Sequence, residues 1–405
     1  MNRRRRMGRA GGRTTRANSL TDPKDKVVIA PDDGHTQPMS RRDFLALSLV
    51  GALAGCLPLS AVQPLTSEPT STWTPESEPT EEPSPTANLD PVNETPTAAP
   101  TETSVAVPEP SPMPVAIPVL GRVVSITDSN VWRGTTLAPD RLQQMLDSGL
   151  TGLMGIAQAD RAWATLFSPE DRVAIKVNTI AGSAYWTHVS LVTALAERLQ
   201  SVGVPAEQIV VYDRQSNEMA SAGYSVNRDG PDVRCYGTDG DYADGWTLLG
   251  TGIGLSQILL DCNALINVPL LKSHSISGMS FALKNHYGTL DRPGKFHGPR
   301  MTEALADLNG LPPIAERTRL TVGDALEICT KGWSSAAIGN SILMSRDPVA
   351  HDAVGLQMLA SAIEREGGNP TAARKRAAPW LAYAAEAGLG VADPELIELL
   401  ELVLG

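Results

Sequence analysis

From residue 119 onward, short apolar runs alternate with stretches in which apolar residues recur every three or four positions. The runs have the length of strands, and the stretches between several of them have the period of helices. The predicted strands cover 122–126, 173–177, 208–212, 264–268, 319–322 and 341–344. Strands that are apolar along their whole length are buried on both faces, so the pattern predicts an α/β fold: a mostly parallel sheet with covering helices.

The clearest predicted helix covers 187–202, with apolar residues at helical spacing and Gly203 as a stop signal. Three further helices are expected at 348–366, near 371–388 and near 394–404. Asp347 is the expected N-cap of the first of these three. Ligands of open α/β sheets bind outside the carboxyl ends of the strands, so functional residues are expected on the loops that follow them.

The first 56 residues have the pattern of an export signal. An apolar run of about eleven residues, 44–54, follows Arg41 and Arg42, and it is shorter than the roughly 20 residues that span a bilayer as a helix. The paired arginines resemble the twin-arginine export signal, and Leu-Ala-Gly-Cys at 53–56 resembles the lipoprotein cleavage box. The expected result is lipidation of Cys56; the alternative is an N-terminal membrane anchor with an incidental cysteine.

The 38 residues before Met39 form a basic leader or an over-extended start, so translation from Met1 or from Met39 stays open. Residues 57–117 consist largely of Pro, Thr, Ser and Glu, with Trp73 as their one aromatic residue. Such a composition buries too little apolar surface to offset the entropy of ordering, which predicts a disordered stalk. The expected organisation is therefore a leader (1–56), a stalk (57–117) and an α/β domain (118–405). We expect a membrane-anchored lipoprotein at the cell surface or in the periplasm, exported by the twin-arginine machinery.

Charge is distributed unevenly along the 405-residue chain, whose formal net charge is -11. Eleven of the 34 Lys and Arg precede Cys56, and residues 118–405 contain 23 basic and 31 acidic residues. This mildly acidic domain excludes a basic protein that coats nucleic acid, and no nucleic-acid partner is expected.

Within that acidic domain, residues 272–300 are locally basic. They contain five Lys or Arg, one acid (Asp291) and three of the five histidines found after residue 118. Solvated surfaces usually mix both signs of charge. The asymmetry favours a site for a phosphate, a carboxylate or an anionic cofactor, and a solvated basic face is the other reading.

Candidate site residues lie in this segment and at the ends of predicted strands. The expected ligand-binding residues are Lys176, Asn178, Lys272, Lys284, Asn285, His286 and Asp324. If the protein is an enzyme, His274 or His297 is the expected acid or base, because imidazole titrates near neutral pH. Four of these groups, Lys176, Lys272, His274 and Lys284, are expected to converge at the carboxyl edge of the sheet. Lys176 could instead extend to solvent. Asp213 and Arg214 could form an intramolecular ion pair or a turn, or they could belong to the site.

Other chemistries have weaker signals. The three histidines are eleven or twelve residues apart, and no HExxH or CxxC motif occurs, so whether a metal or another cofactor binds is left open. Cys235, Cys262 and Cys329 are too dispersed for an iron–sulfur site; they indicate three buried thiols, or one disulfide and one free thiol. No G-x-S-x-G elbow is present, and Gly252-Ile253-Gly254 lacks the third glycine of a dinucleotide fingerprint.

Taken together, six short motifs resemble the domain of unknown function family 362, in order and spacing over about 170–355. They are Ile-Lys-Val-Asn at 175–178, Val-Pro-Leu-Leu-Lys-Ser-His at 268–274, Ala-Leu-Lys-Asn at 282–285 with Gly288, His297, Val-Gly-Asp at 322–324 and Ser-Arg-Asp-Pro-Val-Ala-His-Asp at 345–352. Ala325 stands where the family usually has glycine, and the ferredoxin-like cysteine segments of some relatives are missing here. The resemblance implies a fold region and a pocket but no reaction.

These observations predict a domain that binds an anionic small molecule or cofactor, with an enzymatic role left open. The twin-arginine route often carries proteins with an inserted cofactor, which favours a redox or metal cofactor somewhat. The alternatives are a cell-surface binding protein without catalysis and a structural wall-linked protein.

Overall fold

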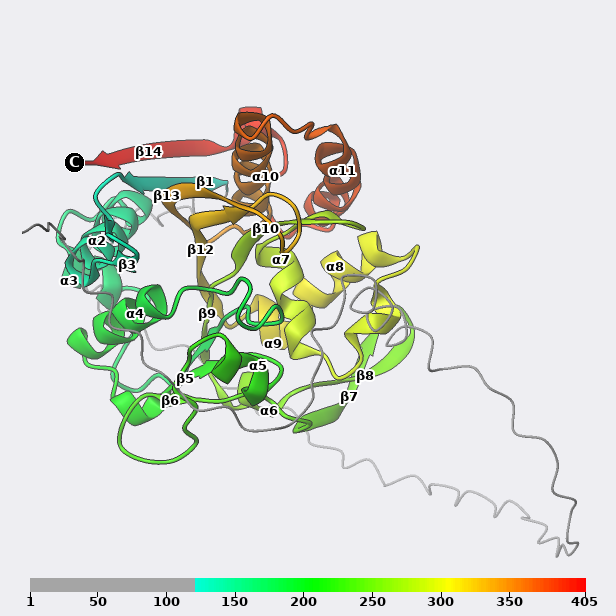
Figure 1. Ribbon diagram of the computed structural model, residues 1–405. Helices are drawn as coiled ribbons and strands as arrows, with labels where there is room; N and C mark the ends of the chain where they lie inside the picture. Colours follow the sequence, from blue (N-terminus) through cyan, green and yellow to red (C-terminus); the bar gives the residue numbers. More distant parts are fainter. Residues whose placement is uncertain (1–120) are drawn as a thin grey trace, which may run out of the picture. The chain divides into compact units, whose positions relative to one another are not determined.

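The computed structural model describes residues 121–405; the predicted leader and stalk lie outside the described residues. One ten-stranded sheet organises the described part, in the order β14-β1-β13-β12-β9-β4-β5-β6, with β10 paired to β12 and to β11 (Figure 1). Its strands are β1 (Arg122–Asp128), β4 (Val173–Lys176), β5 (Ile209–Tyr212), β6 (Arg234–Cys235), β9 (Ala264–Asn267), β10 (Leu270–His274), β11 (Gly278–Ser280), β12 (Thr318–Cys329), β13 (Ala336–Ser345) and β14 (Glu398–Leu404). Most pairings are parallel, and β13 and β11 pair antiparallel, which confirms the predicted fold class.

Helices cover both faces of this sheet. They are α2 (Pro139–Met154), α3 (Ala159–Ala164), α4 (Val189–Ser201), α5 (Ser216–Ser221), α6 (Gln257–Asp261), α7 (Ala282–Asn285), α8 (Met301–Asn309), α9 (Pro312–Ala315), α10 (Pro348–Arg365) and α11 (Thr371–Glu386). Short 3₁₀ helices are η1 (Ala206–Gln208), η2 (His286–Thr289), η3 (Pro293–Phe296) and η4 (Pro394–Leu396), and two small hairpins are formed by β2 (Trp132–Arg133) with β3 (Thr136–Leu137) and by β7 (Tyr242–Leu248) with β8 (Thr251–Ser256). Among residues 121–405, no helix has the length and apolarity to cross a membrane.

The strands contribute to two hydrophobic cores, one on each face of the sheet. Helices α2, α3 and α4 pack on one face, while α8, α10 and α11 pack on the other (Figure 1). Successive residues of a strand point to opposite faces, so Ile175 enters the first core and Ala174 enters the second. Burial on both faces explains why these strands are apolar along their whole length.

The predicted strands and the helices α4, α10 and α11 are present. The carboxylate of Asp347 accepts hydrogen bonds from the backbone N–H groups of Val349 (2.9 Å) and Ala350 (2.8 Å), as expected of the N-cap of α10.

The helix predicted near 394–404 is wrong: this segment forms η4 and then β14, which pairs parallel to β1. Leu and Glu favour helices in isolation, but tertiary pairing overrides such propensities. Here β14 completes the outer edge of β1, and Arg122 of β1 forms an ion pair with Glu398 (Nη2–Oε1 2.6 Å).

The sheet brings the ends of three neighbouring parallel strands to one line. Lys176 at the end of β4 lies in register with Tyr212 of β5 on one side and with Asn267 of β9 on the other. The loops that leave these strands therefore start side by side, and the β10–β11 hairpin and α7 follow directly in the chain. This edge of the sheet carries the pocket described below.

Candidate functional site

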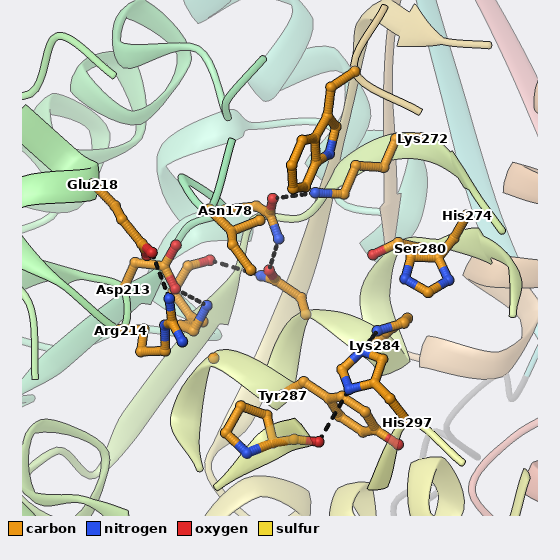
Figure 2. Close-up of a pocket in the computed structure, with 16 residues that line it drawn as sticks. Asn178, Asp213, Arg214, Glu218, Lys272, His274, Ser280, Lys284, Tyr287 and His297 are labelled. Carbon is orange, nitrogen blue, oxygen red and sulfur yellow. Dashed lines mark hydrogen bonds and ion pairs between the residues drawn. The ribbon is translucent and has the colours of Figure 1, made fainter. Parts of the chain in front are cut away.

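A pocket of about 110 Å³ lies at this edge of the sheet (Figure 2). It is lined by seven of the nine site residues predicted from sequence: Lys176, Asn178, Lys272, His274, Lys284, Asn285 and His297. The lining comes from β4, the β10–β11 hairpin, α7, the segment after η3 and the turn at Trp333, so residues up to 157 positions apart in the chain meet here. The pocket also includes Asp213, Arg214 and Tyr287.

The innermost wall is an ion pair. Lys176 is completely buried, and its Nζ donates to Asp213 Oδ1 at 2.7 Å and to the carbonyl of Val177 at 2.7 Å. The other carboxylate oxygen of Asp213 accepts from the backbone N–H (2.6 Å) and the hydroxyl (2.8 Å) of Thr179. Burial opposes ionisation of Asp213, but Lys176 and these hydrogen bonds outweigh it and lower the pKa of the carboxyl group. Lys176 is therefore neutralised within the protein.

Gly288 lies directly against this ion pair. A Cβ atom at this position would stand 2.6 Å from Asp213 Oδ1 and 2.7 Å from Lys176 Nζ. The two atoms bond to each other, and each side chain is held further, Lys176 by the carbonyl of Val177 and Asp213 through Oδ2 by Thr179. The glycine predicted as part of the motif after Asn285 is thus required here by close approach.

A chain of amides connects the next lysine to the floor of the pocket. Lys272 Nζ donates to Asn178 Oδ1 at 2.7 Å, and Asn178 Nδ2 donates to Asn285 Oδ1 at 3.0 Å. Asn285 Nδ2 in turn donates to Asn267 Oδ1 at 2.8 Å. This series of hydrogen bonds fixes the orientation of each amide, but it offers Lys272 no negative charge. Burial, together with repulsion from Lys176, lowers the pKa of Lys272 to about 8.

Lys284 contacts an imidazole instead of a carboxylate. Its Nζ lies 2.8 Å from His297 Nε2 and 4.5 Å from the centre of the Tyr287 ring. His297 Nδ1 lies 3.0 Å from the carbonyl oxygen of Pro293, which can only accept, so Nδ1 carries the proton and Nε2 accepts from Lys284. Burial and repulsion from Lys272 lower the pKa of Lys284 to about 7, and burial and Lys284 lower the pKa of His297.

His274 is held as a neutral donor. Its Nδ1 accepts from the backbone N–H groups of Ile276 and Ser277, both at 3.2 Å, so the proton of the neutral ring resides on Nε2. Burial, with repulsion from Lys284 and His297, lowers the pKa of His274 to about 3. Of the two histidines predicted as acid or base, His297 has the better arrangement for proton transfer, because its Nε2 contacts a second titratable group, Lys284, whereas Nδ1 of His274 is bound to backbone N–H groups.

Positive groups exceed negative groups along this lining. The two acids, Asp213 and Glu218, pair with Lys176 and Arg214 respectively. Lys272 and Lys284 are 4% and 7% exposed, and in the described part of the chain neither forms an ion pair with a carboxylate. Two ammonium groups are thus buried next to one small cavity without a counter-ion of their own.

Two predicted site residues, His286 and Asp324, do not line the pocket. Asp324 is buried and binds His188, whose backbone N–H and Nδ1 lie 2.7 and 2.8 Å from Oδ2. Although burial opposes it, the carboxylates of Asp324 and Glu327 raise the pKa of His188 to about 10. Through these contacts with His188, Asp324 attaches the start of α4 to β12. His286 is also buried, and burial and repulsion from Lys176 lower its pKa to about 3.

Asp213, which the sequence left open between an ion pair or turn and a site role, is the counter-ion of Lys176 and also lines the pocket. Sequence reasoning missed Tyr287 and Trp333, which also line the pocket. Tyr287 stands within the motif around Gly288, and Trp333 is an aromatic residue in a polar turn. That isolated tryptophan is the one signal by which the turn could have been noticed.

No group of three or more His, Cys, Asp or Glu side chains within 121–405 is arranged to hold a metal ion. Cys235, Cys262 and Cys329 are separate buried thiols, the first of the two arrangements that the sequence allowed. Burial raises the pKa of Cys235 and Cys329 to about 12.

Residues 173–357 match the family model described as Domain of unknown function (DUF362). The match covers the motifs that suggested this family and all of the residues that line the pocket. No curated protein matches the chain.

Among solved structures, the lactate racemase apoprotein from Thermoanaerobacterium thermosaccharolyticum is 11% identical with a TM-score of 0.39, over 60% of this chain and 58% of that chain. A protein from Thermotoga maritima is 13% identical with a TM-score of 0.35, over 58% of this chain and 60% of that chain. The chain thus spans about three fifths of the length of each.

Proposed function

We propose that the α/β domain binds a small anionic molecule or cofactor in this pocket, through Lys272 and Lys284. One observation carries the proposal: two buried ammonium groups border the same cavity and have no carboxylate partner among the described residues. Burying an unpaired charge is expensive, and the usual outcome is a lowered lysine pKa or a bound counter-ion. An anion between the two lysines would offset the cost of desolvation and reduce their mutual repulsion.

The dimensions favour a small ligand group. A volume of about 110 Å³ is well below the roughly 300–1,000 Å³ of pockets for drug-sized ligands. A phosphate or a short carboxylate group suits this volume and the available donors, which are Nζ of Lys272, Nζ of Lys284 and Nε2–H of His274. Charge-assisted hydrogen bonds of this kind are the stronger ones in proteins.

The sequence signals before residue 121 supply the cellular context of this proposal. The arginine pair at 41–42 and the cleavage box ending at Cys56 support a membrane-tethered lipoprotein that works outside the cytoplasm. The stalk at 57–117 would separate the binding domain from the membrane, at up to about 3.1 Å per residue. Intact-mass analysis of the exported protein tests this part, since a mature form that retains Met39 contradicts it.

The contact between Lys284 and His297 favours a second candidate, an enzyme that moves a proton on the bound anion. A lysine whose pKa is about 7 next to a neutral imidazole can give or take a proton at physiological pH. The competing alternative is a binding protein without catalysis. Replacing His297 with asparagine separates the two, because an enzyme would lose turnover while keeping ligand affinity, whereas a binding protein would change in affinity alone.

Calorimetric titration of the full chain with phosphate, acetate and malonate tests the proposed binding. We expect at least one of them to bind, and Lys272→Met and Lys284→Met each to weaken it roughly 10- to 100-fold, the effect of losing a charged hydrogen bond. Lys295→Met is the matched control, because Lys295 is exposed on η3 and does not line the pocket. Absence of binding by all three anions, or undiminished binding by both pocket variants, contradicts the proposal.

A further inference from the structure

A second cavity of about 750 Å³ adjoins the anion pocket. His274 and Trp333 line both cavities, so these two side chains form the boundary between an inner pocket and an outer pocket. The outer pocket lies between the β10–β11 turn, the turn that connects β12 to β13, and the start of α11. A ligand whose charged group occupies the inner pocket would extend past Trp333 into this space.

Trp333 is displayed to solvent by a turn that is held in place. Trp333 is 54% exposed. The backbone N–H of Gly332 donates to the hydroxyl of Ser273 at 2.7 Å, the N–H of Thr330 donates to the carbonyl of Ser335 at 3.0 Å, and the Thr330 hydroxyl bonds to Glu366. Lys272 Nζ, the inner-pocket cation, lies 5.9 Å from the centre of the indole ring. A large exposed aromatic ring on a fixed turn beside a charged pocket is an arrangement for stacking a ligand rather than for filling a core.

The rest of the outer lining combines small and apolar residues with polar ones. Besides Ser273, whose hydroxyl accepts from Gly332, side chains with hydrogen-bonding groups are contributed by Ser275, Thr330, Lys331, Glu366, Asn369 and Arg376. A hydrocarbon or a bare aromatic ring would desolvate these groups without pairing them, which is unfavourable. A ring that carries hydroxyl groups can pack one face on the indole and satisfy these groups at its edge.

From these observations we infer that the outer pocket binds the sugar ring of a sugar phosphate or sugar carboxylate, whose anionic group occupies the inner pocket. The inference rests on the proposed anion site and adds the ligand class. Lys272 and Trp333 then act on one molecule: the lysine binds its charge and the tryptophan stacks on its ring. His274, between the two pockets, donates from Nε2 near the link between ring and anion.

Titration of the full chain with four probes tests the inference: inorganic phosphate, glucose 1-phosphate, glucuronate and phenyl phosphate. We expect one of the two sugar anions to bind at least tenfold more tightly than inorganic phosphate and than phenyl phosphate, and which one binds distinguishes a phosphate ligand from a carboxylate ligand. Trp333→Ala should weaken binding of that sugar anion by roughly 5- to 100-fold, the range for loss of ring stacking, and by at least fivefold more than it weakens binding of inorganic phosphate. Trp333→Phe should retain part of the gain. Ile338→Ala is the control, because Ile338 is an exposed apolar residue (58%) of the same hairpin outside both pockets.

The outcomes separate this inference from the proposed function. If phosphate binds and neither sugar anion binds more tightly than phosphate, the outer subsite is refuted while the anion site stands. The same conclusion follows if Trp333→Ala lowers the affinities for phosphate and for the sugar anion by equal factors. If phenyl phosphate exceeds inorganic phosphate in affinity by as much as the sugar anion does, the assignment of the ligand to sugars is refuted. If none of the four probes binds, the inference and the anion site for these classes both fall.

Discussion

Replacing Lys284 with methionine should make the ligand-free protein more stable, and the gain should be large at pH 6 and small at pH 10. The pKa of this lysine falls from its ordinary value of 10.5 to about 7 in the folded protein. Between these two pH values the unfolded chain binds the extra proton, so the stability of the wild type rises with pH across this window. Below pH 7 Lys284 is protonated in both the folded and the unfolded state, so the folded protein bears the full free-energy cost of the buried charge.

The magnitude follows from the size of this window. At about 1.4 kcal/mol for each pH unit, the penalty at pH 6 reaches about 5 kcal/mol, and at pH 10 it falls below about 1 kcal/mol. Lys284 is only 7% exposed, so solvent screening reduces this little. Methionine keeps most of the side-chain volume but loses the contact with His297, which offsets about 1 kcal/mol. A net gain of about 2–4 kcal/mol is expected at pH 6.

Equilibrium unfolding in urea, followed by circular dichroism in phosphate-free buffer, measures this difference at both pH values. Native mass spectrometry of the same samples verifies that no anion is bound. The control is Lys295→Met, which should change stability little at either pH because that ammonium is exposed. If Lys284→Met is less stable than the ligand-free wild type at pH 6, Lys284 is not an uncompensated charge, and the reasoning behind the anion site is refuted.

Four further predictions address the pH dependence, the packing, the lipidation and the protease sensitivity of the protein. Phosphate affinity measured by calorimetry should fall as pH rises from 7 to 9, because the two unpaired lysines, with pKa values of about 8 and about 7, lose their charge there; an affinity independent of pH contradicts this. Gly288→Ala should lower the free energy of unfolding by about 1–3 kcal/mol, since its Cβ would displace the Lys176–Asp213 pair; an unchanged melting temperature argues against that close approach. Cys56→Ala should leave an unprocessed or released protein, and an unaltered membrane-bound form in cell fractionation refutes lipidation. Limited proteolysis should cut within 60–117 and leave a fragment that melts like the whole protein; a melting temperature lower by more than a few degrees would show that this segment packs on the domain.

Local patterns were sufficient to predict much of the fold. Strands such as β4 are buried on both faces, so their apolar runs are continuous in the sequence, and Asp347 precedes α10 as an N-cap must. The error at β14 arose because its Leu-rich and Glu-rich sequence suits a helix, and the partner that makes it a strand, β1, is 276 residues away at the Arg122–Glu398 pair. A pairing over that distance leaves no trace in a local pattern.

The site was predictable to the extent that its residues directly follow strands. Lys176 and Lys272 were identified because a cation interrupts an apolar run, and the structure places both at one pocket. Asp324 was predicted from its place in the motif at 322–324, but its carboxylate meets His188 from a distant loop. The outer pocket was not predicted, because it forms where Trp333 and the start of α11 meet in space.

The most direct measurement of the central claim is a crystal structure of the protein grown with arsenate, an isostere of phosphate whose arsenic gives an anomalous signal. The anion-site account predicts an arsenic peak in the inner pocket, with arsenate oxygens within about 2.7–3.2 Å of both Lys272 Nζ and Lys284 Nζ. Lys284→Met crystals grown in the same way should lose this peak. An inner pocket without anomalous density at arsenate concentrations that saturate any binding seen by calorimetry, or arsenate bound elsewhere, would contradict the account.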